Sequence, residues 1–379
     1  MKVLVVSGIW PPDVGGPASH APEVADHLTG RGHTVEVVTT ADAAPASRAY
    51  PVRWVSRRIP VGLRHVRTMG EIGRRARAAD VVYTTGMFGR SAAGSRAARR
   101  PYVVKLTADP AHERARRRGL TSADVEAFQA EPGDVRVRAL RAARDAELRG
   151  AAHVFCPSAF LRELVVAWGA APERVEVLPN AQPALPPLPE RADARRTFGL
   201  ERPSLAFAGR LTAQKALPLA LEALARTSGV DLVVAGDGPE RADLERRAAE
   251  LGLNGRVRFL GPQPRERVLE LFRGADATLL SSAWENFPHT VVESLAVGTP
   301  VVATAAGGVA EVVTDERNGL LVPSGDVDAL AAAIGRYFAD ERLRNALRAS
   351  AAGSVAAFTP ERIYGRLEEV LLAVARAGR

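Results

Sequence analysis

The most regular pattern along the chain is a series of short apolar runs that alternate with longer amphipathic segments. In the first half the apolar runs predict strands at residues 2–7, 34–39, 80–84, 102–106, 152–155 and 175–178. In the second half they predict strands at 204–208, 230–235, 256–260, 276–280 and 300–303. The runs are continuously apolar rather than alternating, which is typical of strands that helices cover on both faces.

Helical spacing fills the intervals between these runs. It predicts helices at residues 19–30, 134–149, 158–168, 215–227, 240–252, 264–273, 326–338 and 360–378. Repeated strand–helix–strand order favours open parallel sheets, and the order occurs twice over. The predicted fold class is α/β, with two Rossmann-like, doubly wound parallel-sheet domains that face a cleft.

A proline-rich stretch separates the two halves. Residues 178–191, "LPNAQPALPPLPER", hold five prolines and are typical of a stiff linker. We predict a first domain at 1–182 and a second at 183–358, with a final helix at 359–379 that packs back toward the first domain. In open α/β sheets ligands bind outside the carboxyl ends of the strands, so we expect function in the loops that follow strands.

Composition excludes several classes of protein. The chain has 379 residues and one cysteine, Cys156, which rules out an intrachain disulfide and a cysteine-rich metal site. Seven scattered histidines without a close pair argue against a zinc site. We expect a cytoplasmic protein, because this cysteine usage suits a reducing compartment. The opening run "MKVLVVS" is interpreted as a strand rather than a signal peptide.

Positive charge is concentrated in the first half. Residues 1–180 carry 27 Lys and Arg against 18 Asp and Glu, whereas the remainder carries 24 against 25. Such a field attracts nucleic acid, an anionic membrane face or a phosphorylated small molecule. The basic stretch 53–80, with interleaved Val, Ile, Leu and Met, fits peripheral contact with the inner membrane face, a soluble anionic acceptor, or merely an arginine-rich background. No nucleic acid is expected, because a stacking platform is not visible among 20 aromatic residues.

Two loops after strands carry features of anion binding. In "SGIWPPDVGGPASH", Gly15 and Gly16 let backbone N–H groups approach an anion at a helix N-terminus, or they form a connecting turn. In "FAGRLTAQKA", Arg210 and Lys215 flank the start of a helix, where its dipole disfavours cations. An anion between the two side chains explains this placement, and a solvated basic loop is the alternative.

A third loop contains Gly236-x-Gly238 after a predicted strand. A dinucleotide fingerprint needs a third glycine, but Arg241 stands at that position. We therefore favour a tight structural turn.

Two glutamates bracket the fourth loop, "SAWENFPHTVVES". Glu285 precedes a helix predicted to start near Pro288, and Glu293 lies in its second turn. The two acids would reach different parts of a ligand such as sugar and ribose hydroxyls, or they would simply favour the helix dipole. Cations, backbone N–H groups and hydroxyl-binding acids together suit a sugar nucleotide.

The order and spacing of these motifs resemble those of the retaining glycosyltransferases of family four, which have the GT-B fold. The motifs are "GG" with a following His, "LTGRGHTVEVVTT", "FCPSAFLRELVVAWG", "FAGRLTAQKA", "AGDGPE", "FLGP", "ENFPHTVVE", "GTPVVAT" and "GGVAEVV". The resemblance covers nearly the whole chain.

The resemblance implies roles for matching residues. It assigns Arg210 and Lys215 to the leaving diphosphate, Glu285 to the transferred sugar and Glu293 to the ribose. It assigns further donor contacts to Gly15, Gly16, His20, Asn286, Phe287, Pro288 and His289, and it puts the base near 259–262. On the acceptor side it suggests Asp109 and His112, with an exposed basic helix as the alternative.

Some positions depart from the family pattern. Ala216 stands where glycine is usual, and Asn286 and Pro288 stand where glycines are common. Ala181 replaces the glycine that follows the linker asparagine, Asn180. None of these changes removes a charged donor contact, so they leave the donor sugar open rather than the activity.

The resemblance implies a retaining hexosyltransferase that uses a nucleotide-diphosphate sugar as co-substrate and needs neither metal nor cofactor. The acceptor would be a hydroxyl of a glycan, a lipid or a small molecule. Two other classes stay open: an isomerase of the nucleotide-sugar 2-epimerase type, which shares the fold, and a basic nucleic-acid-binding protein.

Overall fold

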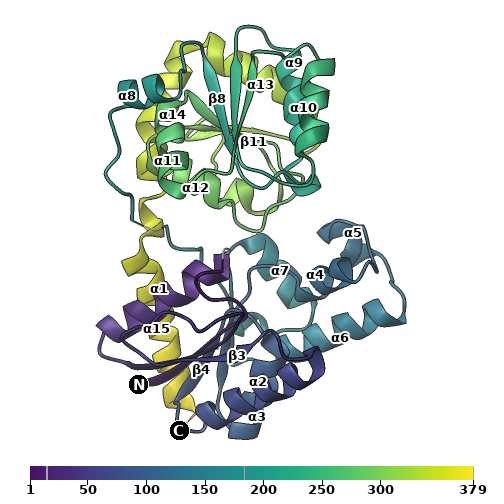
Figure 1. Cartoon of the computed structure of the whole chain (residues 1–379), viewed down its shortest axis with the longest axis vertical. Helices are drawn as coiled ribbons and strands as arrows, with labels where there is room; N and C mark the ends of the chain where they lie inside the picture. The colour runs from purple at the N-terminus through teal and green to yellow at the C-terminus, as the bar shows by residue number, and fades with distance from the viewer. Residues whose placement is uncertain (14–15, 183, 379) are drawn as a thin grey trace. The chain divides into compact units, whose positions relative to one another are not determined.

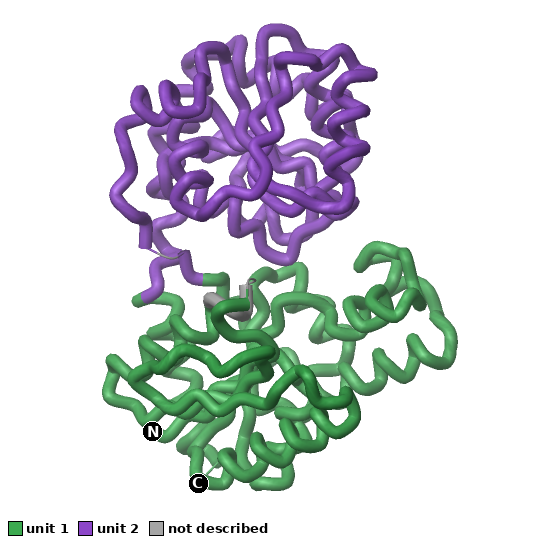
Figure 2. Tube along the Cα trace, in the orientation of Figure 1, with its two compact units in different colours: residues 1–180, 361–379 green, residues 181–360 purple. Residues whose placement is uncertain are grey.

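The computed structural model describes residues 1–13, 16–182 and 184–378. The chain divides into two units (Figure 2). Unit 1 comprises Met1–Asn180 and Glu361–Arg379, and unit 2 comprises Ala181–Pro360. The final helix therefore belongs to the same unit as the first half of the chain.

Unit 1 is built on a parallel sheet that has seven strands within the described residues (Figure 1). The order is β3-β2-β1-β4-β5-β6-β7. The strands are β1 Lys2–Ser7, β2 Thr34–Ala41, β3 Val52–Ser56, β4 Val81–Thr84, β5 Tyr102–Lys105, β6 His153–Cys156 and β7 Val175–Val177. The helices are α1 Gly16–Gly30, α2 Val61–Ala76, α3 Phe88–Ala98, α4 Pro110–Arg117, α5 Val125–Ala130, α6 Val135–Arg149, α7 Ala159–Ala167 and α15 Pro360–Ala377.

Unit 2 repeats this plan with a parallel sheet of six described strands in the order β10-β9-β8-β11-β12-β13. The strands are β8 Ser204–Ala208, β9 Asp231–Ala235, β10 Val257–Gly261, β11 Ala277–Leu280, β12 Val301–Thr304 and β13 Gly319–Val322. The helices are α8 Arg191–Thr197, α9 Leu217–Ala225, α10 Arg241–Glu250, α11 Arg265–Gly274, α12 His289–Ala296, α13 Val327–Ala339 and α14 Glu341–Ser354.

The strand β8 illustrates why continuous apolar runs become central strands. Leu205 and Phe207 pack on one face of the sheet, in a core shared with α9, α10 and α13. Ala206 and Ala208 pack on the other face, in a core shared with α11. Because both faces are covered, every position of the strand is apolar or small. The predicted α/β class with two parallel-sheet domains is confirmed.

The sequence pattern missed two strands at sheet edges. The edge strand β3, "VRWVS", exposes Arg53 and Trp54, so it lacks a continuous apolar run. The other, β13, contains only "GLLV". Polar composition likewise concealed the helix α2, which lies within the basic stretch 53–80.

The last helix, α15, is attached to α1 within unit 1 (Figure 1). Glu368 of α15 accepts from His33 at 2.8 Å and from Arg31 at 3.1 Å. Burial alone would raise the pKa of Glu368, but these two hydrogen bonds and the nearby charges hold it below its usual value. Tyr364 of α15 donates to Glu23 of α1. These contacts anchor the C-terminal helix in the first unit.

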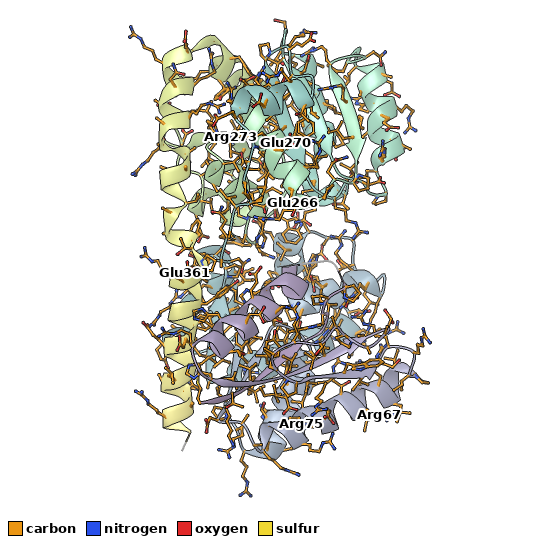
Figure 3. The ribbon with its side chains drawn as sticks, turned by 60° about the vertical axis from the view of Figure 1, so that its left-hand side comes forward. Arg67, Arg75, Glu266, Glu270, Arg273 and Glu361 are labelled. Atoms are coloured by element: carbon orange, nitrogen blue, oxygen red, sulfur yellow. The ribbon has the colours of Figure 1, made fainter. Side chains whose placement is uncertain are left out.

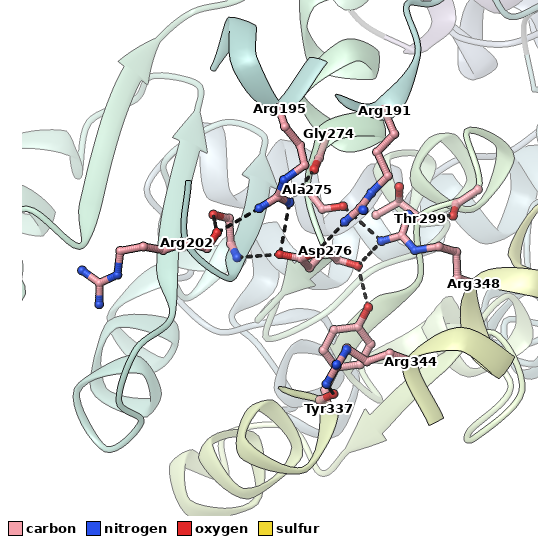
Figure 4. A network of polar contacts seen from close by, with 12 residues as sticks. Arg191, Arg195, Arg202, Gly274, Ala275, Asp276, Thr299, Tyr337, Arg344 and Arg348 are labelled. Carbon is pink, nitrogen blue, oxygen red and sulfur yellow. Dashed lines mark hydrogen bonds and ion pairs between the residues drawn. The ribbon is translucent and has the colours of Figure 1, made fainter. Parts of the chain in front are cut away.

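A polar network fixes the amino edge of the sheet of unit 2 (Figure 4). Asp276, which precedes β11, accepts from Arg191 at 2.6 Å and from Arg195 at 3.3 Å. The Asp276 carbonyl accepts from Tyr337 at 2.5 Å and from Arg348 at 2.8 Å. The network thus joins α8, α13 and α14 to the sheet at the edge opposite to the carboxyl ends of its strands.

Each sheet has a topological switch point, where the strand order reverses. The switch lies between β1 and β4 in unit 1 and between β8 and β11 in unit 2. Loops at the carboxyl ends of these strands are the usual place for a ligand in this architecture. Among the helices of the described residues, none has the length and apolar character needed to cross a bilayer.

Candidate functional site

The switch point of unit 2 brings together two of the predicted site residues. Lys215 ends a short 3-10 turn after β8, and Glu285 lies in the loop after β11. Lys215 Nζ lies 2.5 Å from Glu285 Oε1, and Ser282 Oγ donates to the same oxygen at 2.7 Å. The two charged side chains are 17% and 7% exposed. A cation and a carboxylate are therefore held together at the edge where a ligand is expected.

Hydrogen bonds join the two loops that carry this pair. Ala283 N donates to Gln214 O at 2.8 Å, and Gln214 Nε2 donates to Trp284 O at 3.1 Å. Ser281 Oγ donates to Lys215 O at 2.9 Å. Sequence patterns did not identify Gln214, Ser281 or Ser282 as site residues. The only signal was their position in loops that directly follow strands.

A glycine pair after β12 fixes the backbone of Glu285. Gly308 N donates to Glu285 O at 2.8 Å. Gly307 has a φ of +54°, and a Cβ added there would lie 2.2 Å from Glu285 O. A side chain at Gly307 would therefore displace the loop that carries the carboxylate.

The Gly236-x-Gly238 motif packs against the loop that follows β8. A Cβ at Gly236 would lie 1.9 Å from Gly209 O, and one at Gly238 would lie 2.2 Å from Leu211 O. Leu211 N also donates to Asp237 O at 2.9 Å. Close backbone approach thus explains the glycines, as the structural interpretation of this motif predicts.

Arg210 differs from Lys215 in its surroundings. Its side chain is exposed, and no carboxylate of the described residues lies within the 4 Å of an ion pair. Lys215 forms an ion pair with Glu285, whereas Arg210 stands at the carboxyl end of β8 without such a pair in the described residues. The loop therefore offers one paired cation and one unpaired cation to an anion.

Ala216 holds a backbone conformation that favours glycine. It has a φ of +45° and a ψ of +43°, directly between Lys215 and the first residue of α9. The left-handed conformation costs an L-residue about 1–2 kcal/mol, whereas glycine adopts it freely at an entropic cost of about 0.5–1 kcal/mol.

We expect Ala216→Gly to raise the free energy of unfolding by about 0.5–1 kcal/mol, because it relieves this strain. Urea denaturation measures the change. The matched control is Ala332→Gly at an exposed position inside α13, which should lower stability by about 1 kcal/mol. Destabilisation by both substitutions would contradict the assignment of strain to Ala216.

Glu293 lies on α12, as predicted, and has a cationic partner. Arg265 Nε, at the start of α11, donates to Glu293 Oε1 at 2.6 Å. Sequence reasoning missed Arg265, because its partner is 28 residues away in the chain. A ribose that bound Glu293 would share this carboxylate with Arg265.

Residues 286–289, between the two glutamates, contact one another. Phe287 is buried, and its ring centroid lies 5.3 Å from that of His289. His289 N donates to Phe287 O at 3.1 Å. Pro288 is the N-cap residue of α12, and Asn286 is half-buried. The donor contacts predicted for these four residues stay predictions.

The donor-side predictions in unit 1 involve the start of α1. Gly15 lies outside the described residues, and Gly16 is the first residue of α1. His20 Nε2 lies 2.7 Å from Tyr83 Oη, and its ring centroid lies 5.7 Å from that of Tyr364. Burial raises the pKa of Tyr83 well above its usual value, so the phenol stays neutral. His20 is thus held between the sheet and α15.

The loop after β1 is fixed by an arginine that sequence reasoning missed. Arg57 Nη1 donates to Asp13 Oδ1 at 2.9 Å, and Trp10 N donates to Asp13 Oδ2 at 3.2 Å. The hydrogen bond from Arg57 holds the pKa of Asp13 below its usual range despite partial burial. The ion pair therefore positions residues 10–13 at the carboxyl end of β1.

The two acceptor-side candidates, Asp109 and His112, are engaged within unit 1. Asp109 Oδ2 accepts from Arg144 at 2.8 Å and from Gln129 at 3.0 Å, and its side chain is fully buried. His112 is also buried, and its Nε2 lies 2.9 Å from Ala123 O. The structure gives both residues a packing role, and contact with an acceptor stays a prediction.

Two family models match the chain and together span most of it. The model described as Glycosyl transferases group 1 matches residues 190–353, and the model described as Glycosyl transferase 4-like domain matches residues 15–181. The chain therefore combines a glycosyl transferase 4-like domain in its first half with a group 1 glycosyl transferase domain in its second half.

Curated relatives give a similar picture over shorter stretches. The chain is 39% identical over 240 residues to the D-inositol 3-phosphate glycosyltransferase of Nocardia farcinica, covering 57% of this chain and 52% of that protein. It is 38% identical over 182 residues to the protein of the same name from Mycobacteroides abscessus, covering 46% and 41%. The chain thus spans about half the length of the curated relatives it matches.

Solved structures match the chain over nearly its full length. Anabaena HepE in complex with UDP aligns with a TM-score of 0.80 and 22% identity, covering 98% of this chain and 100% of that one. WaaG, a glycosyltransferase involved in lipopolysaccharide biosynthesis, aligns with a TM-score of 0.71 and 17% identity, covering 98% and 99%. At these identities the likeness shows the fold, and it confirms the predicted GT-B type.

Proposed function

We propose that the chain is a retaining glycosyltransferase that moves a hexosyl-type sugar from a nucleotide-diphosphate sugar to an acceptor hydroxyl. The observation that carries the proposal is the contact between Lys215 and Glu285 at the switch point of unit 2. A leaving diphosphate needs a cation, which Lys215 supplies. A transferred sugar needs a group that accepts hydrogen bonds from its hydroxyls, which Glu285 supplies. HepE was solved with UDP and with UDP-glucose, which supports the choice of donor class.

The proposed reaction exchanges one bond at the anomeric carbon for another. The bond to the diphosphate oxygen breaks, and its electron pair stays on the diphosphate. The acceptor oxygen bonds to the same face of the sugar, and its proton passes to the departing phosphate oxygen. Arg210 and Lys215 stabilise the negative charge that develops on the diphosphate, which is the main source of catalysis in such a step. Glu285 orients the sugar by accepting a hydrogen bond from a hydroxyl.

We propose that the reaction needs no metal ion, because two side-chain cations serve the diphosphate. The transfer rate should then be unchanged by EDTA. A loss of activity that added Mg²⁺ restores would contradict this part of the proposal.

The donor class is tested by a thermal-shift screen against UDP, GDP and ADP sugars, followed by acceptor trials. We expect at least one nucleotide sugar to raise the Tm, with a much smaller rise in Lys215→Ala. If no nucleotide sugar raises the Tm, the proposal is wrong. Turnover of the nucleotide sugar without any acceptor, giving an epimerised product, would support the isomerase instead.

We also propose peripheral contact between α2 and an anionic bilayer, at the inner membrane face. On the outward side of α2, Leu63 and Val66 are 55% and 60% exposed. The same side of the helix carries Arg67 and Arg74 at helical spacing. Arg67 is labelled in Figure 3. Exposed apolar residues interleaved with arginines fit a surface that inserts shallowly among anionic headgroups.

The membrane proposal predicts sedimentation with phosphatidylglycerol vesicles at low salt, lost at high salt. The double variant Leu63→Gln/Val66→Gln should lose most of this sedimentation. Val135→Gln is the matched control, because Val135 is 69% exposed on a different helix, α6. Equal sedimentation of both variants, or none for the unmodified protein, would refute the contact.

A further inference from the structure

Four basic side chains gather at the carboxyl edge of the sheet of unit 1. The parallel topology places the first turns of α2, α3 and α4 at this edge. Arg64 and His65 come from α2, Arg90 from α3 and Arg114 from α4. These four residues are called the basic cluster below. Three separate elements thus direct positive charge to one place.

Electrostatic coupling between the members agrees with their placement at one edge of the sheet, where α2 packs against α3. Burial and the neighbouring charges of Arg64 and Arg114 lower the pKa of Arg90 to about 10. Burial, followed by the charges of Arg90, Arg64 and Arg114, also lowers the pKa of His65. Like charges that lower one another's pKa destabilise the protein while the site is empty.

Few acids balance this charge. Within the described residues no carboxylate makes an ion pair with Arg64 or Arg90, since none lies within 4 Å of either guanidinium. Arg114 has one partner, Glu147, at 3.6 Å. Burial raises the pKa of Glu147, and its Oε2 has no hydrogen-bond partner among the described residues. The basic cluster therefore carries an excess of positive charge.

The helix that carries Arg90 also begins without a side-chain cap. Its N-cap residue, Met87, has a φ of +56° and makes no capping hydrogen bond through its side chain. In contrast, Asp109 caps α4 through Ala111 N. An uncapped helix start adds a positive partial charge beside Arg90 and accommodates an anion.

We propose that Arg64, His65, Arg90 and Arg114 bind a phosphate group carried by the acceptor. Guanidinium groups match phosphate oxygens in geometry as well as in charge. This inference rests on the proposed glycosyl transfer, because the sheet of unit 1 holds the predicted acceptor side. The phosphate belongs either to a soluble phosphorylated acceptor or to a lipid headgroup, and the experiment distinguishes these two sources.

Calorimetric titration with inorganic phosphate tests the site. The parent protein is the whole chain with Lys215→Ala, because this change removes the diphosphate contact in unit 2. Adding Arg90→Gln should weaken phosphate binding about tenfold or more, since a charged hydrogen bond is lost. The control is Arg116→Gln, an exposed arginine of α4 that has no ion pair within the described residues, and it should change the affinity less than about twofold. Equal affinity in both variants would overturn the proposal.

Vesicles identify the source of the phosphate. If free phosphate does not bind, vesicles are tested in the Leu63→Gln/Val66→Gln background, which removes the membrane contact proposed for α2. In this background sedimentation with phosphatidic acid vesicles, but not with phosphatidylcholine, should be lost in Arg90→Gln and kept in Arg116→Gln. That outcome assigns the site to a lipid headgroup, whereas equal sedimentation of both variants would reject it. If free phosphate binds and Arg90→Gln weakens this binding as expected, the site is assigned to a soluble phosphorylated acceptor.

Two further readouts separate this site from folding and from the donor site. Arg90→Gln should keep or raise the Tm in phosphate-free buffer, because it relieves repulsion between like charges; Arg64→Gln provides a second variant. The thermal shift caused by a nucleotide sugar should be unchanged in Arg90→Gln. A phosphate effect without any nucleotide-sugar effect would support the basic cluster and refute the proposed glycosyl transfer.

Discussion

Replacing Lys215 by alanine is expected to lower the rate of glycosyl transfer by about 10²–10³. In the proposed reaction the reason is electrostatic, because the departing diphosphate would lose one of the two cations assigned to its developing charge, and losing one such contact typically costs this much. The effect should fall mainly on kcat, since the charge is greatest in the transition state. Steady-state kinetics with the donor identified by the screen gives the measurement.

Controls separate this loss from unfolding. Without Lys215, Glu285 stays buried with no countercharge, so the Tm should fall as well. The double variant Lys215→Ala/Glu285→Gln should recover most of the Tm but none of the activity. Arg317→Ala removes an exposed cation of the same unit that pairs with no carboxylate in the described part of the chain, and it should leave the rate within about twofold. Near-normal turnover in folded Lys215→Ala would refute the diphosphate role.

Replacing Gly307 by alanine is expected to lower the free energy of unfolding by several kcal/mol. The new Cβ would lie 2.2 Å from Glu285 O, and a φ of +54° adds about 1–2 kcal/mol of strain. To relieve the clash, the backbone of Glu285 and that of Gly307 must separate, which disturbs the loop that holds Glu285 beside Lys215. A folded variant should therefore also lose activity, even though Gly307 itself has no side chain to contact a ligand.

Gly335→Ala is the matched control for this change. Gly335 lies inside α13, and a Cβ there would meet nothing within 4 Å. The same substitution should therefore stabilise the protein by about 0.5–1 kcal/mol. Chemical denaturation of both variants measures the contrast, and stabilisation by both substitutions would show that the close approach at Gly307 is tolerated.

The architecture could be predicted from the sequence because each central strand is a continuous apolar run. The run at 204–208 is apolar at every position after Ser204, and both faces of that strand are covered. The edge strand β3 carries exposed Arg53 and Trp54, so its partner in the sheet, not its composition, makes it a strand. The helix α2 was not predicted for a similar reason. Its Leu63 and Val66 face outward while Thr68 is buried, so its apolar positions do not mark the buried face.

The core of the candidate site could be predicted because topology alone places loops after strands at one edge. Lys215 and Glu285 lie 70 residues apart in sequence, and the strand order makes them neighbours. The side-chain partners of the other candidate residues could not be predicted from topology. The partner of Glu293, Arg265, depends on side-chain packing between two helices. The burial of Asp109 depends on Arg144, 35 residues further on, and no local pattern reports it.

The division of the chain has a practical consequence for protein engineering. The chain passes from the first unit to the second at Asn180–Ala181 and returns at Pro360–Glu361. In sequence terms the second unit is an insertion, so it can be exchanged between homologues as a cassette of residues 181–360. A chimaera cut only at residue 180 would instead separate Glu368 from His33 and Arg31 and replace them with a foreign interface. On the proposed function, a transplant of donor specificity therefore needs two junctions rather than one.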